Sequence, residues 1–195
     1  ATSRVLVADE LVDAFLEKLK ARAEAIRVAD PFEPEVEMGA LVNQAQYQRV
    51  LGHIARGVND GARLVCGGKR PADLSRGYFI QPTVFTDVPL DSALWREEIF
   101  GPVLCVRRFA TEDEAIALAN DSEFGLVASV VSRNPGTADR VANALQAGLV
   151  WINAPQVIFP QAAWGGYKQS SIGRELGPWG LQAFQELKHV IRAAF

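Results

Sequence analysis

The sequence predicts an α/β fold built on a parallel sheet. Strand-like and helix-like segments alternate along the chain, which is typical of parallel strands joined by covering helices. Residues 103–109, VLCVRRF, form a nearly continuous apolar run, as strands buried inside parallel sheets do. Capping residues recur ahead of the helical segments, so the alternation does not rest on hydrophobic spacing alone.

Several segments have the apolar and β-branched composition of strands. They are residues 4–7, 63–66, 79–88, 103–109, 127–132 and 149–153. The third contains Pro82. Because proline lacks a backbone N–H, we expect this strand at a sheet edge or at a bulge. A terminal strand is expected over residues 186–193.

Two helices are expected in the first third of the chain. The first starts at Leu11 with Asp9 as its N-cap, because its apolar residues then fall on one face. The second begins after Asn43, which forms a capping box with Gln46, and Gly61 ends it.

Two more helices follow the long central strand. Thr111 and Glu114 form a capping box for the first of them. Asn134 fits the N-cap and Pro135 the first position of the other, with the glycine at 148 expected as its C′ residue.

The expected domain organisation has one boundary. Residues 1–165 contain no repeat, low-complexity tract or flexible linker, so we expect one domain. Residues 154–180 are rich in Gly, Pro, Gln and aromatic residues, and a loop of that length is usually functional or a connection. Residues 166–195 are therefore expected to be a Gly-rich connection and a tail.

Composition excludes some partners. The chain has 20 Lys and Arg against 23 Asp and Glu, a net charge of −3, and no basic stripe for a phosphate backbone, so nucleic acid is not expected. No apolar run reaches the ~20 residues of a membrane span. The first residues, ATSRVLVADE, do not resemble a signal peptide, so a cytoplasmic location is expected.

Residues capable of thiol or metal chemistry are few. Cys66 and Cys105 lie in strand-like runs, where an apolar setting raises a thiol pKa, so both are expected to be reduced, buried and structural rather than nucleophilic. His53 and His189 have no paired ligand spacing, and no metal site is expected.

Three spaced stretches carry a family likeness, and together they resemble the aldehyde dehydrogenase superfamily. They are EEIFGPV at 97–103, VWIN at 150–153, and WGGYK at 164–168 running on to GRELG at 173–177. The likeness extends through the whole chain. ATSR at 1–4, together with Trp164 and GPWG at 177–180, looks most like the betaine-aldehyde and amino-aldehyde branch.

The resemblance implies the catalytic-domain portion of an enzyme that oxidises an aldehyde to a carboxylate. In that family a cysteine thiolate attacks the carbonyl and hydride passes to NAD or NADP. The family's nucleophile, general base and oxyanion-hole asparagine correspond to positions upstream of Ala1, as does most of its cofactor domain. The chain alone is therefore expected to be inactive and to bind the cofactor weakly or not at all.

The same resemblance implies two cofactor-binding residues. Glu98 matches the glutamate that hydrogen-bonds a ribose hydroxyl on the nicotinamide side, and its other interpretation is a solvated charge beside Glu97. Phe100 matches the aromatic residue near the nicotinamide ring. Its alternative is a core phenylalanine before a Gly-Pro turn.

A substrate pocket is expected on the Gly-rich loop. Trp164 matches the aromatic residue at the mouth of the aldehyde pocket, where it would hold a quaternary ammonium by cation–π attraction, and Ile158 and Phe159 are expected to line the same loop. The alternative for Trp164 is packing against Trp151 or Trp179.

Other polar residues of these motifs are expected to be structural. Asn153 is expected to orient its loop through the backbone, and Arg174 and Glu175 to fix loop shape.

In the family the tail strand joins an oligomerisation sheet shared between subunits, so a homo-oligomer through the C-terminal strand is expected.

Two functions remain open at this point. The first function is the aldehyde dehydrogenase portion described above. The alternative is a naturally truncated, non-catalytic module that oligomerises or binds a ligand.

Overall fold

The computed structural model describes residues 3–154 and 156–194. Contacts divide the chain into two compact units, unit 1 (Ala1–Ala115) and unit 2 (Ile116–Phe195). The sequence pattern did not indicate this division. The boundary expected between residues 165 and 166 stays a prediction.

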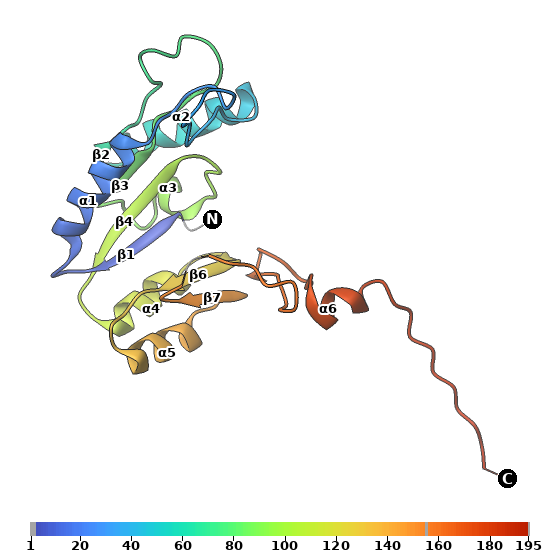
Figure 1. The fold of residues 1–195 in the computed structure, drawn as a ribbon. Helices are drawn as coiled ribbons and strands as arrows, with labels where there is room; N and C mark the ends of the chain where they lie inside the picture. Colours follow the sequence, from blue (N-terminus) through green and yellow to red (C-terminus); the bar gives the residue numbers. More distant parts are fainter. Residues whose placement is uncertain (1–2, 155, 195) are drawn as a thin grey trace. The chain divides into compact units, whose positions relative to one another are not determined.

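Unit 1 contains a four-stranded sheet in the order β1-β4-β3-β2 (Figure 1). Its strands are β1 (Arg4–Ala8), β2 (Arg63–Cys66), β3 (Thr83–Thr86) and β4 (Val103–Phe109). β4 pairs in parallel with β1 and with β3, whereas β2 is antiparallel to β3. The predicted α/β class and parallel pairing are confirmed, with one antiparallel edge strand added.

The expectation for Pro82 was wrong. β3 starts at Thr83, after the proline, and lies inside the sheet between β4 and β2. The register irregularity lies in β2, between Leu64 and Cys66. Because the strand begins one residue later, the missing N–H of Pro82 removes no ladder bond from an interior strand.

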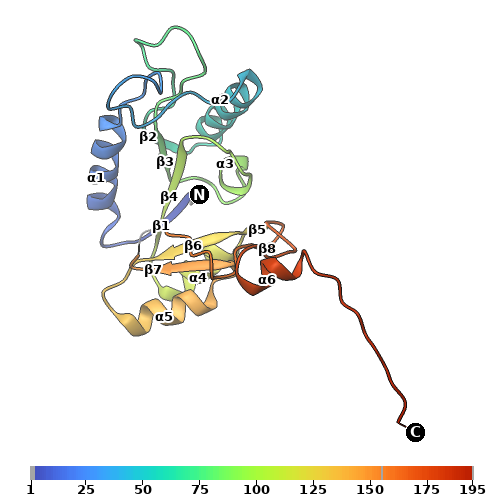
Figure 2. The same cartoon turned by 45° about the vertical axis from the view of Figure 1, so that its right-hand side comes forward.

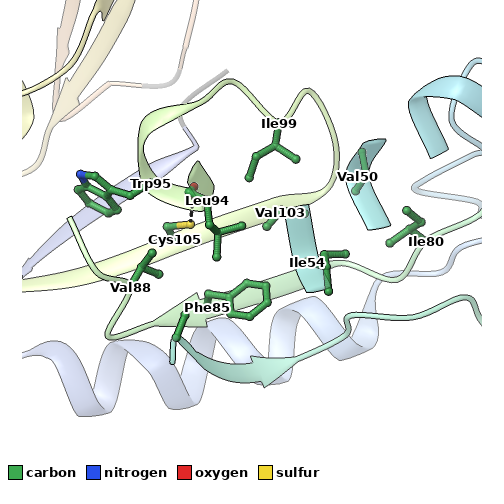
Figure 3. Packing of buried hydrophobic residues seen from close by; sticks show 11 residues of the cluster. Val50, Ile54, Ile80, Phe85, Val88, Leu94, Trp95, Ile99, Val103 and Cys105 are labelled. Carbon is green, nitrogen blue, oxygen red and sulfur yellow. Dashed lines mark hydrogen bonds between the residues drawn. The ribbon is translucent and has the colours of Figure 1, made fainter. Parts of the chain in front are cut away.

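Helices cover both faces of this sheet. They are α1 (Val12–Ala25), α2 (Gln44–Asn59) and the short α3 (Ala93–Arg96). One buried cluster joins α1 to the sheet through residues that include Leu16, Val84 and Val106. The other joins α2 and α3 to the opposite face around Phe85 and Cys105 (Figures 2 and 3). Neighbouring strand residues point to opposite faces, which explains why one strand serves both clusters.

Of the two helix caps predicted near the start of the chain, one is confirmed and the other is wrong. Asn43 Oδ1 accepts the N–H of Gln46 at 2.9 Å and caps α2 as expected. Asp9 is not the N-cap of α1, because Leu11 occupies that position without a side-chain hydrogen bond. The Asp9 carboxylate instead lies 3.8 Å from the guanidinium of Arg108.

α4 (Glu112–Asn120) crosses the division between the units. The Glu114 N–H bonds Thr111 Oγ1 at 3.2 Å, and Glu114 Oε2 accepts the N–H of Ala110 at 2.8 Å. The capping pair is therefore confirmed, with the glutamate reaching one residue further back than in a standard capping box.

Unit 2 contains two small sheets. β6 (Val127–Val130) pairs in parallel with β7 (Leu149–Ile152), and β5 (Phe124–Gly125) pairs antiparallel with β8 (Tyr167–Lys168). Its helices are α5 (Pro135–Ala144) and α6 (Gly177–Gln182). No helix among the described residues is long and apolar enough to cross a bilayer.

The N-cap of α5 is as predicted, but its C-terminal end is not. Asn134 Oδ1 accepts the N–H of Thr137 at 3.1 Å. Leu145 is the C-cap, so Gly148 is not the C′ residue. Gly148 has a different reason to lack a side chain, because a Cβ there would lie 1.7 Å from the carbonyl oxygen of Gly165.

The expected terminal strand is absent from the structure. Residues 186–193 form no helix or strand, and the trace that follows α6 has no strand beside it in unit 2 (Figure 1). The side chains of Leu187, Val190 and Ile191 are exposed. A strand needs a neighbour to complete its ladder of hydrogen bonds, and the described part of this chain offers none.

Candidate functional site

The predicted cofactor residues lie in the loop between α3 and β4. Ile99 is 4% exposed and belongs to the core cluster around Phe85 (Figure 3). Its two neighbours face solvent, since Glu98 is exposed and the Phe100 side chain is 74% exposed. Phe100 has a φ of 55°, a left-handed value that turns the chain before β4. The buried Ile99 therefore lies between an exposed glutamate and an exposed phenylalanine.

The side chains of α2 hold the backbone of this loop. Gln46 Nε2 donates to the carbonyl oxygens of Ile99 at 2.9 Å and Phe100 at 2.8 Å. Arg49 Nη2 donates to the carbonyl oxygen of Glu98 at 2.8 Å. These bonds hold the backbone of the loop, so the carboxylate of Glu98 is not needed to hold it. Sequence reasoning missed both donors, although their three-residue spacing places them on one helix face.

The two adjacent glutamates of the loop differ in their surroundings. Glu97 Oε2 lies 3.7 Å from His53 Nε2 and 3.9 Å from Arg56 Nη2. Among the described residues, the ion pairs of this loop involve Glu97 and not Glu98. The pKa of His53 is lowered first by burial and then by the charge of Arg56, while Glu97 raises it. Both glutamates are exposed, and Glu98 is the one whose carboxylate has no ion pair among the described residues.

The exposure of Phe100 argues against one of its two interpretations, that of a core phenylalanine. A core role for Phe100 does not fit its 74% exposure within this chain. The adjacent Gly101 makes the close approach instead, because a Cβ there would lie 2.6 Å from Cγ2 of the buried Val50. The loop therefore packs through Ile99 and Gly101, and the Phe100 ring stays available for contact.

The predicted substrate residues lie in unit 2, on the loop after β7. Trp151 Nε1 donates to the carbonyl oxygen of Val157 at 2.8 Å and ties down the loop next to Ile158 and Phe159, which are 50% and 61% exposed. Trp164 is half-buried, and its backbone exchanges two 2.7 Å hydrogen bonds with Glu175. The loop thus has fixed ends and exposed apolar side chains.

The residues expected to shape these loops do so. Asn153 bonds both backbone groups of Ser132, accepting its N–H at 3.0 Å and donating to its carbonyl oxygen at 2.8 Å. Arg174 Nη1 donates to the carbonyl oxygen of Gly166 at 2.8 Å, and its guanidinium lies 5.6 Å from the ring centroid of Tyr167. The backbone of Glu175 pairs with that of Trp164. The side chains of Asn153 and Arg174 are therefore structural, as predicted, whereas Glu175 shapes its loop through its backbone.

Both thiols are free and buried, as predicted. Burial raises the pKa of Cys66, and it raises the pKa of Cys105 to about 12. The Cys105 Sγ lies 3.5 Å from the carbonyl oxygen of Leu94, inside the core (Figure 3). A thiol in this setting does not supply a thiolate near neutral pH.

Other site types have less support. No group of three potential metal-binding side chains occurs among residues 3–154 and 156–194. A groove of about 580 Å³ lies in unit 1 beside residues such as Arg27, Lys69 and Gln81. None of the predicted site residues lines this groove, so the loop after α3 remains the candidate cofactor site.

Comparison with known proteins identifies the family. Residues 1–190 match the model of the aldehyde dehydrogenase family. The chain is 48% identical over 190 residues to a chloroplastic aminoaldehyde dehydrogenase of Arabidopsis thaliana and 45% identical over 192 residues to a chloroplastic betaine aldehyde dehydrogenase of Amaranthus hypochondriacus. These matches cover 97% and 98% of this chain but 38% of each relative. The chain thus spans little more than a third of their length.

Solved structures agree with this match. An NAD⁺ complex of betaine aldehyde dehydrogenase from Staphylococcus aureus superposes with a TM-score of 0.90 at 43% identity, covering 93% of this chain and 37% of that one. An NAD⁺ complex of aldehyde dehydrogenase from Bacillus cereus gives 0.92 at 44% identity, with 95% and 38% covered. The chain therefore belongs to the aldehyde dehydrogenase family.

Proposed function

We propose that this chain supplies the nicotinamide side of the cofactor site of an aldehyde-oxidising enzyme. The observation that carries the proposal is the loop Glu98 to Phe100, whose backbone is bonded to α2 while its carboxylate and ring stay exposed. A carboxylate accepts hydrogen bonds from two adjacent hydroxyls at once, which suits a ribose. The bound nicotinamide would accept the hydride. NAD is the cofactor named for the two solved relatives, and NADP is the alternative.

We propose that Trp164, Ile158 and Phe159 contribute to the entrance of the aldehyde pocket. Exposed apolar side chains on a loop with anchored ends suit this role, because the anchors reduce the conformational entropy that the loop loses when a ligand binds. A tryptophan face attracts a cationic nitrogen by ~1–2 kcal/mol when desolvated. Relatives are named for betaine aldehyde and for aminoaldehydes, so an aldehyde bearing a cationic nitrogen is the proposed substrate class.

The chain alone is proposed to be inactive. Aldehyde oxidation in this family requires a thiolate that attacks the carbonyl, and burial raises the pKa of both Cys66 and Cys105. The test is formation of reduced nicotinamide by the chain with betaine aldehyde and simpler aldehydes, and no turnover is expected. Turnover that disappears in Cys66→Ala or Cys105→Ala would show that a buried thiol reacts and would contradict the proposal.

Cofactor binding has its own test. We expect NAD⁺ to bind the chain weakly in calorimetry, because the loop offers contacts on the nicotinamide side only. Glu98→Ala should weaken this binding further, and Glu123→Ala, at an exposed carboxylate of unit 2, is the matched control. A micromolar dissociation constant that survives Glu98→Ala would indicate another nucleotide site.

The exposed tail favours self-association, which is also the basis of the non-catalytic alternative. Leu187, Val190 and Ile191 are 103%, 73% and 84% exposed, and the segment 186–193 has no strand partner in the described chain. Pairing with a second copy would complete the ladder and cover these side chains. Light scattering should show an oligomer for the full chain and a smaller species for a form ending at Gln185. A monodisperse monomer at tens of micromolar would rule this out.

The cytoplasmic location stays a prediction. Several plant relatives carry other locations in their names, chloroplastic for the Arabidopsis protein and peroxisomal for one from Pisum sativum.

A further inference from the structure

One face of α2 follows the cofactor loop along its length. The side chains on this face recur at helical spacing and contact successive residues of the segment from Glu97 to Phe100. We call them the α2 polar stripe: Gln46, Arg49, His53 and Arg56. The first two bond backbone oxygens, whereas the last two approach a side chain, the carboxylate of Glu97. The stripe therefore holds the backbone of the loop at one end and faces the carboxylate of Glu97 at the other.

His53 is the buried member of the stripe. Its side chain is 1% exposed, and within the described residues its Nε2 atom has no hydrogen-bond partner. A buried polar nitrogen without a partner costs about 1–3 kcal/mol. Glu97 Oε2 lies 3.7 Å from this nitrogen, beyond the ~3.2 Å limit of an ordinary N–H···O hydrogen bond. A small shift of Glu97 would satisfy the nitrogen.

The tautomer of His53 follows from its other neighbour. Arg56 Nη2 lies 3.4 Å from Nδ1, and a guanidinium can only donate. Nδ1 is therefore the acceptor, and in the neutral ring the proton sits on Nε2, facing Glu97. The charged groups that act on the ring are Arg49 and Arg56 of α2 and Glu97 at the end of α3. Burial and the two arginines lower the pKa of His53, so the ring is neutral near pH 7.

We propose that His53 is a positioning residue for cofactor binding: its Nε2–H bonds the Glu97 carboxylate when Glu98 engages a ribose, and this bond fixes the position of Glu98. The proposal rests on the cofactor role of Glu98 given above. Glu97 and Glu98 are adjacent in the chain, so a bond that holds the Glu97 side chain restrains the stretch of loop from which the Glu98 side chain extends. The bond forms at the moment of binding and therefore adds to affinity rather than to loop shape alone.

The experiment is an NMR titration of the labelled full chain with NAD⁺. The amides of Glu98 and Phe100 report cofactor binding, and the ¹⁵N shifts of the His53 ring report the tautomer and the Nε2 hydrogen bond. We expect the Nε2 signal to move with the same binding curve as the amides. Glu97→Ala, which removes the acceptor, should weaken NAD⁺ binding by about tenfold, the factor that corresponds to 1.4 kcal/mol, and should abolish the Nε2 response.

Variants separate positioning from folding. Glu97 has a half-exposed side chain, so Glu97→Ala removes the acceptor without disturbing the core. His53→Phe should lose affinity like Glu97→Ala. His53→Gln should recover part of it because an amide can donate to Glu97, and His189→Gln in the exposed tail is the matched control.

The outcomes distinguish the two proposals. If the amides of Glu98 and Phe100 respond to NAD⁺ while the His53 ring and the affinity of Glu97→Ala stay unchanged, the positioning role is wrong and the cofactor site stands. If those amides do not respond at all, the cofactor site is wrong and the role of His53 falls with it.

Discussion

Unit 1 and unit 2 hold their loops in place by different means. Unit 1 has a four-stranded sheet with a buried apolar cluster on each face, and its cofactor loop is anchored in one of them. Unit 2 has two pairs of short strands and buries fewer large apolar side chains, such as Val130 and Trp151. Its loops depend instead on single polar contacts, those of Asn153 and Arg174.

The difference bears on what each unit can do alone. Two-stranded pairs are marginal without further packing, so a unit built from them gains most from a partner. A four-stranded sheet covered on both faces does not depend on one. We therefore expect the cofactor loop to keep its geometry in the isolated chain, while the segment beyond α6 takes its final form only on association.

The largest change in stability is expected for a substitution in the core of unit 1. Phe85→Ala should lower the free energy of unfolding of unit 1 by about 3–5 kcal/mol, because the ring is 0% exposed and its removal leaves a cavity. Hydrogen exchange of the β3 and β4 amides measures the loss. Phe184→Ala, at a side chain 90% exposed, should change stability by less than about 0.5 kcal/mol. A larger effect at Phe184 would reverse the comparison.

A pair of glycines tests how tightly the cofactor loop packs. Gly101→Ala should destabilise unit 1 by about 1–3 kcal/mol, since its Cβ would lie 2.6 Å from Val50 Cγ2. Gly52→Ala is the matched control. Nothing lies within 4 Å of a Cβ at this exposed position of α2, so alanine should stabilise the helix by about 0.8–1 kcal/mol. Urea unfolding of the two variants should therefore shift in opposite directions, and shifts of the same sign would contradict this packing.

Two asparagine caps compare the units directly. Asn43→Ala removes the cap of α2 in unit 1, and Asn134→Ala removes the cap of α5 in unit 2. Each change should cost about 1 kcal/mol. Hydrogen exchange resolved by residue should show the loss in the mutated unit only. A loss in both units from either variant would mean that they unfold as one.

The smallest expected effect is a dependence on pH that belongs to unit 1. The pKa of His53 is lowered from 6.5 in the folded chain, so below about pH 6.5 the unfolded chain binds a proton that the folded chain does not. The free energy of unfolding of unit 1 should therefore fall as the pH drops from about 7 to about 5. His53→Gln should flatten this dependence and His189→Gln should not. An unchanged slope in His53→Gln would assign the effect to another group.

Local signals predicted most of the elements. The strands around Val5 and Cys105 and the caps at Asn43 and Asn134 were found because composition and capping act over a few residues. The family motifs pointed to Glu98 in the same way. Composition also placed both cysteines in strands, and both are buried there.

Contacts between distant residues decided the rest. Gly148 was predicted to end a helix, yet a glycine is needed there because the backbone of Gly165 lies too close for a side chain. The residues that hold Glu98 and its neighbours come from α2, at separations such as 53 residues between Gln46 and Ile99. No window of sequence contains both partners of such a bond.

The sequence by itself determined the α/β class and the order of the longer helices and strands. It also predicted cofactor roles for Glu98 and Phe100, which stay predictions. Tertiary structure alone decided that Ile99 is buried while Glu98 and Phe100 are exposed, and that His53 faces Glu97. The physical reason is that exposure and hydrogen-bond partners belong to pairs of segments that meet only after the sheet has formed. The tail from 186 to 193 is the limiting case, because a strand has no ladder until a second one lies beside it.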